Sequence, residues 1–304
     1  MKNYDFAFIG NPVVPNSEKR YDGIIDEMQQ NRQARLIGFC GDQLVIKSVG
    51  EKRDIFLTQA LLPSLKPDWE NACFLGLDNG KPILAAPVLI EPSQLRPPFA
   101  LTNLRSVWTQ GLMPLEQTGV LAQAASLLNW HKNNQFCSSC GQQTVMFGGG
   151  VKRICTHCKR EHFPRIDPVV IMLVHYQDKC LLVRTPNYET GRYTCISGFV
   201  EQGETVEAAV RRESYEEMGV KIGAVSYMAS QPWPFPYTLM LGFHAHAVAQ
   251  DITIDRDEME DGRWFTRDDV EAMMNGTHID GFHVPPKGAI AHYLIREWLD
   301  AKTQ

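Results

Sequence analysis

The pattern of apolar and polar positions predicts an α+β arrangement for residues 1–132. Short β-rich runs flank a Gly-Asp turn at 41–42, and a second pair flanks Asp-Asn-Gly at 78–80, which is a hairpin signal. Within 115–132, apolar residues recur at intervals of three and four, which predicts a helix with one buried face. We therefore assign residues 1–132 to a first, N-terminal domain.

After residue 165 the pattern predicts a second domain, which we assign to residues 166–304. Two apolar β-rich runs, at 169–174 and 179–184, surround a Gln-Asp turn and predict another hairpin. The remaining predicted elements are a strong helix at 205–218, strands at 224–229 and 239–249, and a closing helix at 287–300.

The segment between the two domains, residues 133–165, is too short for an ordinary core but holds four of the eight cysteines. These follow the spacing C-x2-C-x14-C-x2-C, as Cys137, Cys140, Cys155 and Cys158. Four thiolates make a closed tetrahedral zinc site, and the ion is then structural because no position is left for water. Free thiols or two disulfides are the alternatives, and His157 could replace one cysteine, but the spacing favours zinc bound by four cysteines.

Composition and charge narrow the classes of function. The 304 residues carry a net charge of -5, which argues against a protein that grips long nucleic acid through a basic surface. Binding of a nucleotide or an RNA end stays open. No signal peptide and no run of 18 or more apolar residues is recognised, so we expect no membrane partner and a cytoplasmic location.

Carboxylates gather on one face of the helix predicted at 205–218, where Glu213, Glu216 and Glu217 fall within an arc of about 100°. Such a face is often merely solvated. Here, however, further residues stand at fixed offsets, namely Gly198, Glu204, Arg212 and Gly219. Divalent cations held by carboxylates neutralise a pyrophosphate and activate water, and Arg212 can hold a glutamate by two hydrogen bonds. The pattern predicts metal-assisted pyrophosphate hydrolysis.

This segment, G-x5-E-x7-R-E-x2-E-E-x-G-V from residue 198, resembles the Nudix box, with Ser214 where that family usually has an aliphatic residue. Downstream, SQPWPFPYT at 230–238 resembles the SQPWPFPxS signature of NADH pyrophosphatases of the NudC type, with Thr238 replacing the final serine. A zinc ribbon before the Nudix domain fits the same family. The resemblance covers residues from about 105 to 304, whereas residues 1–100 match only as a variable N-terminal domain.

The resemblance implies hydrolysis of NADH or NAD to AMP and nicotinamide mononucleotide, and removal of NAD caps from RNA. It also implies a Nudix α/β/α sandwich with a mixed sheet, a homodimer, and Mg²⁺ or Mn²⁺ as the activating ion. Water would attack the adenylyl phosphorus, with Glu217 or Glu258 helping to deprotonate it. The residues implied as catalytic are Arg212, Glu213, Glu216, Glu217 and Glu258, and the implied Mg²⁺ or Mn²⁺ ligands are the Ser197 carbonyl, Glu213, Glu217 and Glu258.

The same resemblance implies a set of substrate contacts. They are Arg105, Phe163, Phe199, Gln231, Pro232, Trp233, Pro234, Phe235, Pro236, Tyr237, Thr238 and Ala291. The aromatic residues offer ring faces for a base, although core packing would explain any one of them equally well. Gly150 falls where some members have a substrate-contacting glutamate, and Phe163 falls where some have tyrosine.

Two rival functions are weighed against this interpretation. One is a Nudix enzyme that acts on ADP-ribose, coenzyme A or diadenosine polyphosphates, and the Pro/aromatic segment argues against it. The other is a Nudix-like sensor or zinc-ribbon adaptor that binds nucleotide without cutting it. The complete set of box glutamates argues against the sensor, since binding alone would not need them.

Overall fold

The computed structural model describes residues 5–186 and 188–301, and their contacts divide the chain into two compact units. The N-terminal unit comprises residues 7–166 together with 232–237. The C-terminal unit comprises the residues up to Phe6, then 167–231 and 238 onward. The short segment 232–237 therefore belongs by its contacts to the N-terminal unit, although the chain on both sides of it belongs to the other.

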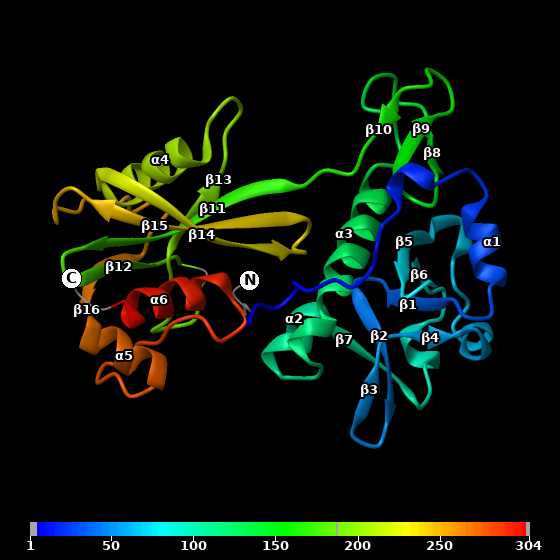
Figure 1. Cartoon of the computed structure of the whole chain (residues 1–304), viewed down its shortest axis with the longest axis horizontal. Coiled ribbons are helices and arrows are strands. Elements are labelled where there is room, and N and C mark those ends of the chain that lie inside the picture. The colour runs from blue at the N-terminus through cyan, green and yellow to red at the C-terminus, as the bar shows by residue number, and fades with distance from the viewer. Residues whose placement is uncertain (1–4, 187, 302–304) are drawn as a thin grey trace. The chain divides into compact units, whose positions relative to one another are not determined.

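The N-terminal unit is built on a seven-stranded sheet in the order β3-β2-β1-β6-β5, with β4 added to β1 and β7 added to β2 (Figure 1). Its helices and strands are α1 (Ile24–Gln30), β1 (Arg35–Cys40), β2 (Gln43–Val49), β3 (Lys52–Asp54), β4 (Leu57–Thr58), β5 (Cys73–Asp78), β6 (Lys81–Pro87), β7 (Phe99–Asn103), α2 (Leu104–Thr109) and α3 (Gly119–Asn133). Both predicted hairpins are present, as β1–β2 and β5–β6. The parallel pairing of β1 with β6 joins them into one sheet, against which α3 packs.

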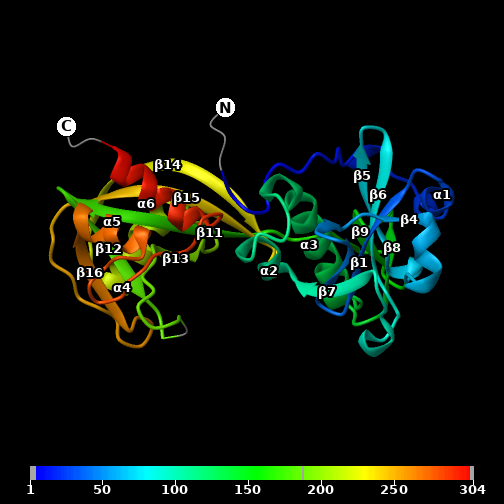
Figure 2. The ribbon, with the colours of Figure 1, turned by 90° about the horizontal axis from the view of Figure 1, so that it is seen from below.

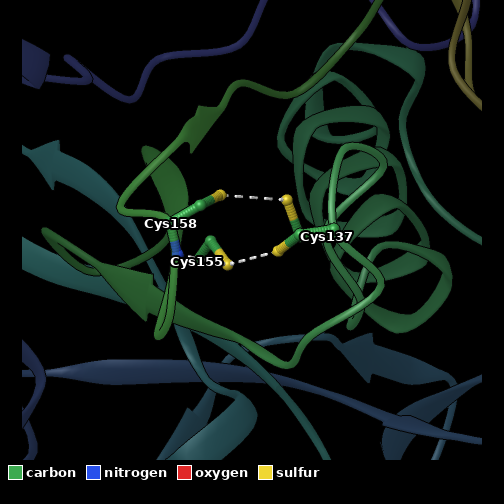
Figure 3. A group of neighbouring side chains, drawn as sticks. Cys137, Cys155 and Cys158 are labelled. Atoms are coloured by element: carbon green, nitrogen blue, oxygen red, sulfur yellow. Dashed lines mark hydrogen bonds between the residues drawn. The ribbon is translucent and has the colours of Figure 1, made fainter.

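The cysteine-bearing segment forms a small antiparallel sheet in the order β10-β9-β8. Its strands are β8 (Thr144–Phe147), β9 (Lys152–Cys155) and β10 (Glu161–His162). The sulfur atoms of Cys137 and Cys158 lie 3.6 Å apart, and those of Cys140 and Cys155 lie 3.5 Å apart (Figure 3). All four sulfur atoms fall within 4.8 Å of one another, whereas His157 is not part of the group. This donor set and geometry fit a tetrahedral structural zinc ion.

The glycines at 148–150 join the cysteine-bearing segment to the rest of the N-terminal unit. The carbonyl of Gly149 accepts a hydrogen bond from the Phe74 amide at 2.9 Å, and the carbonyl of Gly150 lies 2.9 Å from His131 Nε2. Burial lowers the pKa of His131 to about 4, so the ring is neutral and its Nε2–H donates. A Cβ at Gly150, where φ is +97°, would lie 2.9 Å from the Cys73 sulfur. Only glycine fits this contact.

The C-terminal unit contains a mixed six-stranded sheet in the order β14-β15-β11-β12-β16, with β13 paired to β11. Its elements are β11 (Asp167–Tyr176), β12 (Lys179–Arg184), β13 (Ile196–Phe199), α4 (Val206–Met218), β14 (Ile222–Trp233), β15 (Thr238–Ala247), β16 (Asp261–Thr266), α5 (Arg267–Asn275) and α6 (Ile290–Asp300). Strand β11 runs parallel to β15 and antiparallel to β12 and β13, which confirms the predicted mixed sheet.

Helices cover both faces of this sheet, with α4 on one face and α6 on the other (Figures 1 and 2). Alternate residues of β11 explain this, because successive side chains of a strand point to opposite faces. Val170, Met172 and Val174 enter the core cluster that contains Ala209 and Val210 of α4. None of the described helices is long and apolar enough to cross a lipid bilayer.

The geometry of the four-cysteine cluster predicts that the purified chain holds about one zinc ion, because four protein ligands close a single site. Replacing Cys158 with serine should remove the ion and unfold the small sheet, since metal binding supplies the folding free energy of such a segment. Metal analysis and circular dichroism measure both effects. Cys40→Ser, outside the cluster, is the control that should keep its metal. Purified chain without zinc would contradict the assignment.

The contact at Gly150 predicts that Gly150→Ala destabilises the N-terminal unit by about 1–3 kcal/mol through overpacking against Cys73 and His131. Gly80→Ala is the matched control, because Gly80 also has a positive φ, of +78°, but a Cβ there would meet nothing within 4 Å. Urea unfolding of the two variants separates the packing cost from the backbone cost. Equal losses of stability would show that the close contact is unimportant.

Candidate active site

The helix α4 carries the carboxylates, and its ends are fixed by local sequence. Thr205 is the N-cap, and its hydroxyl accepts a hydrogen bond from the Ala208 amide at 3.2 Å. Gly219 ends the helix in the left-handed conformation, with φ of +68°. Ser214, the departure from the family pattern, is fully buried and donates its hydroxyl to the Val210 carbonyl at 2.7 Å. The serine thus satisfies its own hydroxyl within the helix.

Arg212 links the loop before α4 to the carboxylates on the helix. Its Nε and Nη2 donate to the two carboxylate oxygens of Glu204, each at 2.9 Å, and Nη2 also donates to the Phe199 carbonyl at 2.9 Å. Its Nη1 donates to Glu213 at 2.7 Å and to Glu216 at 2.9 Å. The hydrogen bonds from Arg212 hold the pKa of Glu204 below its usual value. One guanidinium therefore orients three glutamates and the end of β13.

Gly198 gives Glu213 the space it occupies. A Cβ built at Gly198 would lie 1.9 Å from the Glu213 carboxyl carbon and about as close to both oxygens, at 2.1 and 2.2 Å. No side chain fits there. The carboxylate of Glu213 therefore lies directly over the backbone of β13 at Gly198.

Glu217 is the most confined carboxylate of the group. It is 3% exposed, and its Oε2 has no hydrogen-bond partner. Burial, followed by the negative charges of Glu213 and Glu258, raises the pKa of Glu217 to about 8. Burial also raises the pKa of Glu213, although Arg212 opposes the shift. One half-buried and one buried carboxylate, incompletely neutralised, are a donor set suited to a hard divalent cation.

Glu258 reaches this group electrostatically from the segment before β16. It is exposed, and its charge contributes to the raised pKa of both Glu213 and Glu217. Among the described residues, only the four cysteines form a group of three or more side chains placed to hold a metal ion, and the three glutamates do not form such a group.

The aromatic residues of the Pro/aromatic segment pack within the N-terminal unit. Strand β14 continues through Trp233, so the segment predicted as a loop is partly strand. The Trp233 ring makes edge contacts with Phe8 at 5.9 Å, Trp108 at 6.0 Å and Phe235 at 5.3 Å. The guanidinium carbon of Arg105 lies 4.8 Å from the centre of the Phe235 ring. Trp233 and Phe235, which the resemblance assigned to substrate binding, are therefore packed against other side chains of the N-terminal unit.

A cavity of about 770 Å³ lies beside this segment, entirely within the N-terminal unit. Its lining includes Arg105 and Phe235, which were predicted from sequence. It also includes Asp42, Asn129 and Lys132, which sequence reasoning missed. Asn129 and Lys132 lie on α3, whereas Asp42 lies in the turn between β1 and β2, and no sequence motif connects the two elements. The cavity is of the size that small ligands occupy in proteins.

The other proposed substrate residues fall into exposed and buried sets. Phe199 in the C-terminal unit and Phe163 in the N-terminal unit expose 58% and 62% of their surface, so both rings are accessible to a ligand. Gln231 and Ala291 are buried, at 0% and 4%. Thr238 is half-buried and begins β15, where it pairs with Asp167. The structure shows no exposed atom of Gln231 with which a substrate could pair.

Comparisons with known families match three consecutive parts of the chain. Residues 33–130 match the NADH pyrophosphatase-like rudimentary NUDIX domain, residues 132–163 the NADH pyrophosphatase zinc ribbon domain, and residues 165–283 the NUDIX domain. The zinc ribbon match agrees with the four-cysteine cluster. Zinc as the structural metal is thereby supported twice, by geometry and by family.

Curated relatives resemble most of the chain. The NAD-capped RNA hydrolase NUDT12 of Homo sapiens is 40% identical over 95% of this chain, which spans 62% of the length of that relative. The NAD-capped RNA hydrolase NudC of Pseudomonas syringae pv. tomato is 36% identical over 74% of this chain and 76% of its own length. The mitochondrial NAD(P)H pyrophosphatase NUDT13 of Homo sapiens is 35% identical over 75% of this chain and 67% of its own. This chain belongs to the NudC-type NADH pyrophosphatases of the Nudix hydrolase family.

Proposed function

We propose that the chain hydrolyses the pyrophosphate bond of NADH and NAD to AMP and nicotinamide mononucleotide, and removes NAD caps from RNA. The observation that carries the proposal is the pair of carboxylates on α4, half-buried Glu213 and buried Glu217, with an unpartnered oxygen on Glu217. The names of the relatives, NAD-capped RNA hydrolase and NAD(P)H pyrophosphatase, support the choice of substrate.

The metal ligands that we propose are Glu213, Glu217, Glu258 and the Ser197 carbonyl, with Mg²⁺ or Mn²⁺ as the ion. All four groups offer oxygen, which hard divalent cations prefer. When bound, such an ion neutralises the charge of the pyrophosphate and makes an attacking water more acidic. Nearby positive charge also favours ionised Glu217, whose pKa is otherwise raised to about 8.

The chain's own residues hold this arrangement in place. Arg212 fixes Glu204, Glu213 and Glu216 through its hydrogen bonds, so the carboxylates do not reorient as charge develops on the phosphate oxygens. Glu217 and Glu258 are the two candidates to accept a proton from the water that attacks the adenylyl phosphorus. Their positions differ, since one is buried and the other exposed.

We assign base recognition to the accessible ring of Phe199 in the C-terminal unit, and assign a ligand site within the N-terminal unit to the cavity beside Arg105 and Phe235. The cavity supports this assignment because a cationic and an aromatic side chain lie together at its wall, as a phosphate joined to a base would require. The segment 232–237 supplies this wall from the chain of the Nudix domain. The rudimentary NUDIX domain would thus have a ligand cavity of its own.

The remaining proposals concern organisation. We propose a division into an N-terminal domain at 1–132, a zinc ribbon at 133–165 and a Nudix domain at 166–304. The family resemblance supports a homodimer, for which light scattering of the full chain would give the mass of two copies. Four zinc-binding thiolates suit a reducing compartment, which supports the cytoplasm.

Product analysis tests the substrate assignment. With NADH and Mg²⁺ or Mn²⁺, the chain should release AMP and reduced nicotinamide mononucleotide in equal amounts. Chromatography separates these products from those of cleavage elsewhere in the molecule. A panel with NAD, NAD-capped RNA, ADP-ribose, coenzyme A and diadenosine polyphosphates ranks the substrates by kcat/KM. If NADH, NAD and NAD-capped RNA all rank below ADP-ribose, the proposed specificity is wrong.

Glu217→Gln should reduce kcat for NADH by about 10²- to 10³-fold, because it removes a negative ligand and a candidate base with little change in side-chain volume. Glu207→Gln is the control, since Glu207 is exposed on the first turn of the same helix. Steady-state rates of both variants, with thermal unfolding to confirm folding, measure the effect. Hydrolysis of NADH by Glu217→Gln at the wild-type rate would contradict the enzymatic assignment.

A further inference from the structure

Gln231 is the last residue of β14 that belongs to the C-terminal unit, directly before the segment 232–237. Its side chain is fully buried. Both ends of its amide are engaged: Nε2 donates to the Gly288 carbonyl at 2.7 Å, and Oε1 accepts from the Ile290 amide at 2.8 Å. Because Gln231 has no exposed surface, its amide is closed to a substrate group in this structure.

The partners of Gln231 form the beginning of α6. The N-cap of α6 is Ala289, which has no side-chain group able to accept a hydrogen bond from the first turn. Gln231 supplies the missing acceptor from a neighbouring strand, because its Oε1 receives the amide of Ile290, the first residue of the helix. Its Nε2 also ties down Gly288, whose φ is +94°. Gln231 thus supplies a hydrogen-bond acceptor to the first turn of α6, which has no side-chain cap of its own.

The start of α6 is tightly packed against the sheet. Ile290 is 3% exposed, and a Cβ at Gly242 of β15 would lie 2.8 Å from its Cδ1. Ala291, a proposed substrate contact, follows directly and is also buried. A shift of β14 at Gln231 would therefore move the first turn of α6 and Ala291 with it.

We propose that Gln231 is a positioning residue that fixes the part of β14 directly before the Pro/aromatic segment to the first turn of α6, and does not itself contact substrate. This inference rests on the proposed function, because the segment it positions is the one assigned to substrate binding. The amide is required for its chemistry: one end must donate and the other must accept. A carboxylate accepts at both ends and would face the Gly288 carbonyl with no proton between them.

The test compares Gln231→Glu with Gln231→Leu in the full chain. Gln231→Glu should raise KM for NADH about tenfold at pH 8, with kcat changed less than about threefold, because a buried carbonyl loses its donor while α4 is untouched. At lower pH the carboxyl introduced by this substitution takes up a proton, and as a buried acid it can both donate and accept. The ratio of its KM to that of the wild type should therefore fall towards one near pH 5.5. Gln231→Leu can neither donate nor accept, so its KM ratio should stay raised at every pH.

Two further measurements make the result decisive. Gln250→Glu, the same change at an exposed position of the C-terminal unit, should keep the wild-type KM at both pH values. Hydrogen exchange of residues 288–294 should be faster in Gln231→Glu than in the wild type at pH 8, and this readout does not depend on activity. An unchanged KM, or a raised KM ratio in Gln231→Glu that does not fall at low pH, would overturn the proposal. A wild-type chain that leaves NADH intact would refute the proposed function. Hydrogen exchange would still test whether Gln231 fixes the first turn of α6.

Discussion

Three glutamates on one face of α4 repel one another, and the burial of Glu217 removes the water that would screen that repulsion. Arg212 offsets part of the charge and sets the directions of Glu204, Glu213 and Glu216. Glu217 receives no such compensation, and its pKa rises to about 8. The negative charge of the site is therefore incompletely neutralised, and a bound divalent cation would neutralise it. Gly198, which has no side chain, leaves space for Glu213, and the caps at both ends of α4 fix the helix that carries the carboxylates.

The other metal has a different task. Four thiolates around one position leave no opening for a reactant, so zinc there organises the chain and takes no part in hydrolysis. The small sheet that it stabilises is anchored to the N-terminal unit through the carbonyls of Gly149 and Gly150. The neutral His131 ring and the absence of a side chain at Gly150 make that contact possible. A metal site and a glycine contact together replace the core that this short segment lacks.

The Pro/aromatic segment shows how packing and binding share residues. Trp233 and Phe235 were assigned to substrate from their resemblance to a signature, yet their rings also form an aromatic cluster with Phe8 and Trp108. The cavity wall at Phe235 and Arg105 is a consequence of that cluster, since it holds the ring and the guanidinium in place. Gln231, at the start of the same signature, is engaged with α6. One short signature thus contains both residues that were assigned to a ligand and a residue, Gln231, that hydrogen-bonds to the start of α6.

Features that depend on local spacing could be predicted from the order of residues alone. The pattern of apolar and polar positions predicted α4, turn residues predicted the hairpins, and paired cysteines predicted the zinc site, because each depends on residues close together in the chain. Folding decided what depends on distant contacts: the parallel pairing of β1 with β6, the burial that raises the pKa of Glu217, and the cavity built from separate elements. The role of Gln231 belongs to this second group. Its partners lie 57 and 59 residues away, and only the tertiary fold brings an unfinished helix end to its amide.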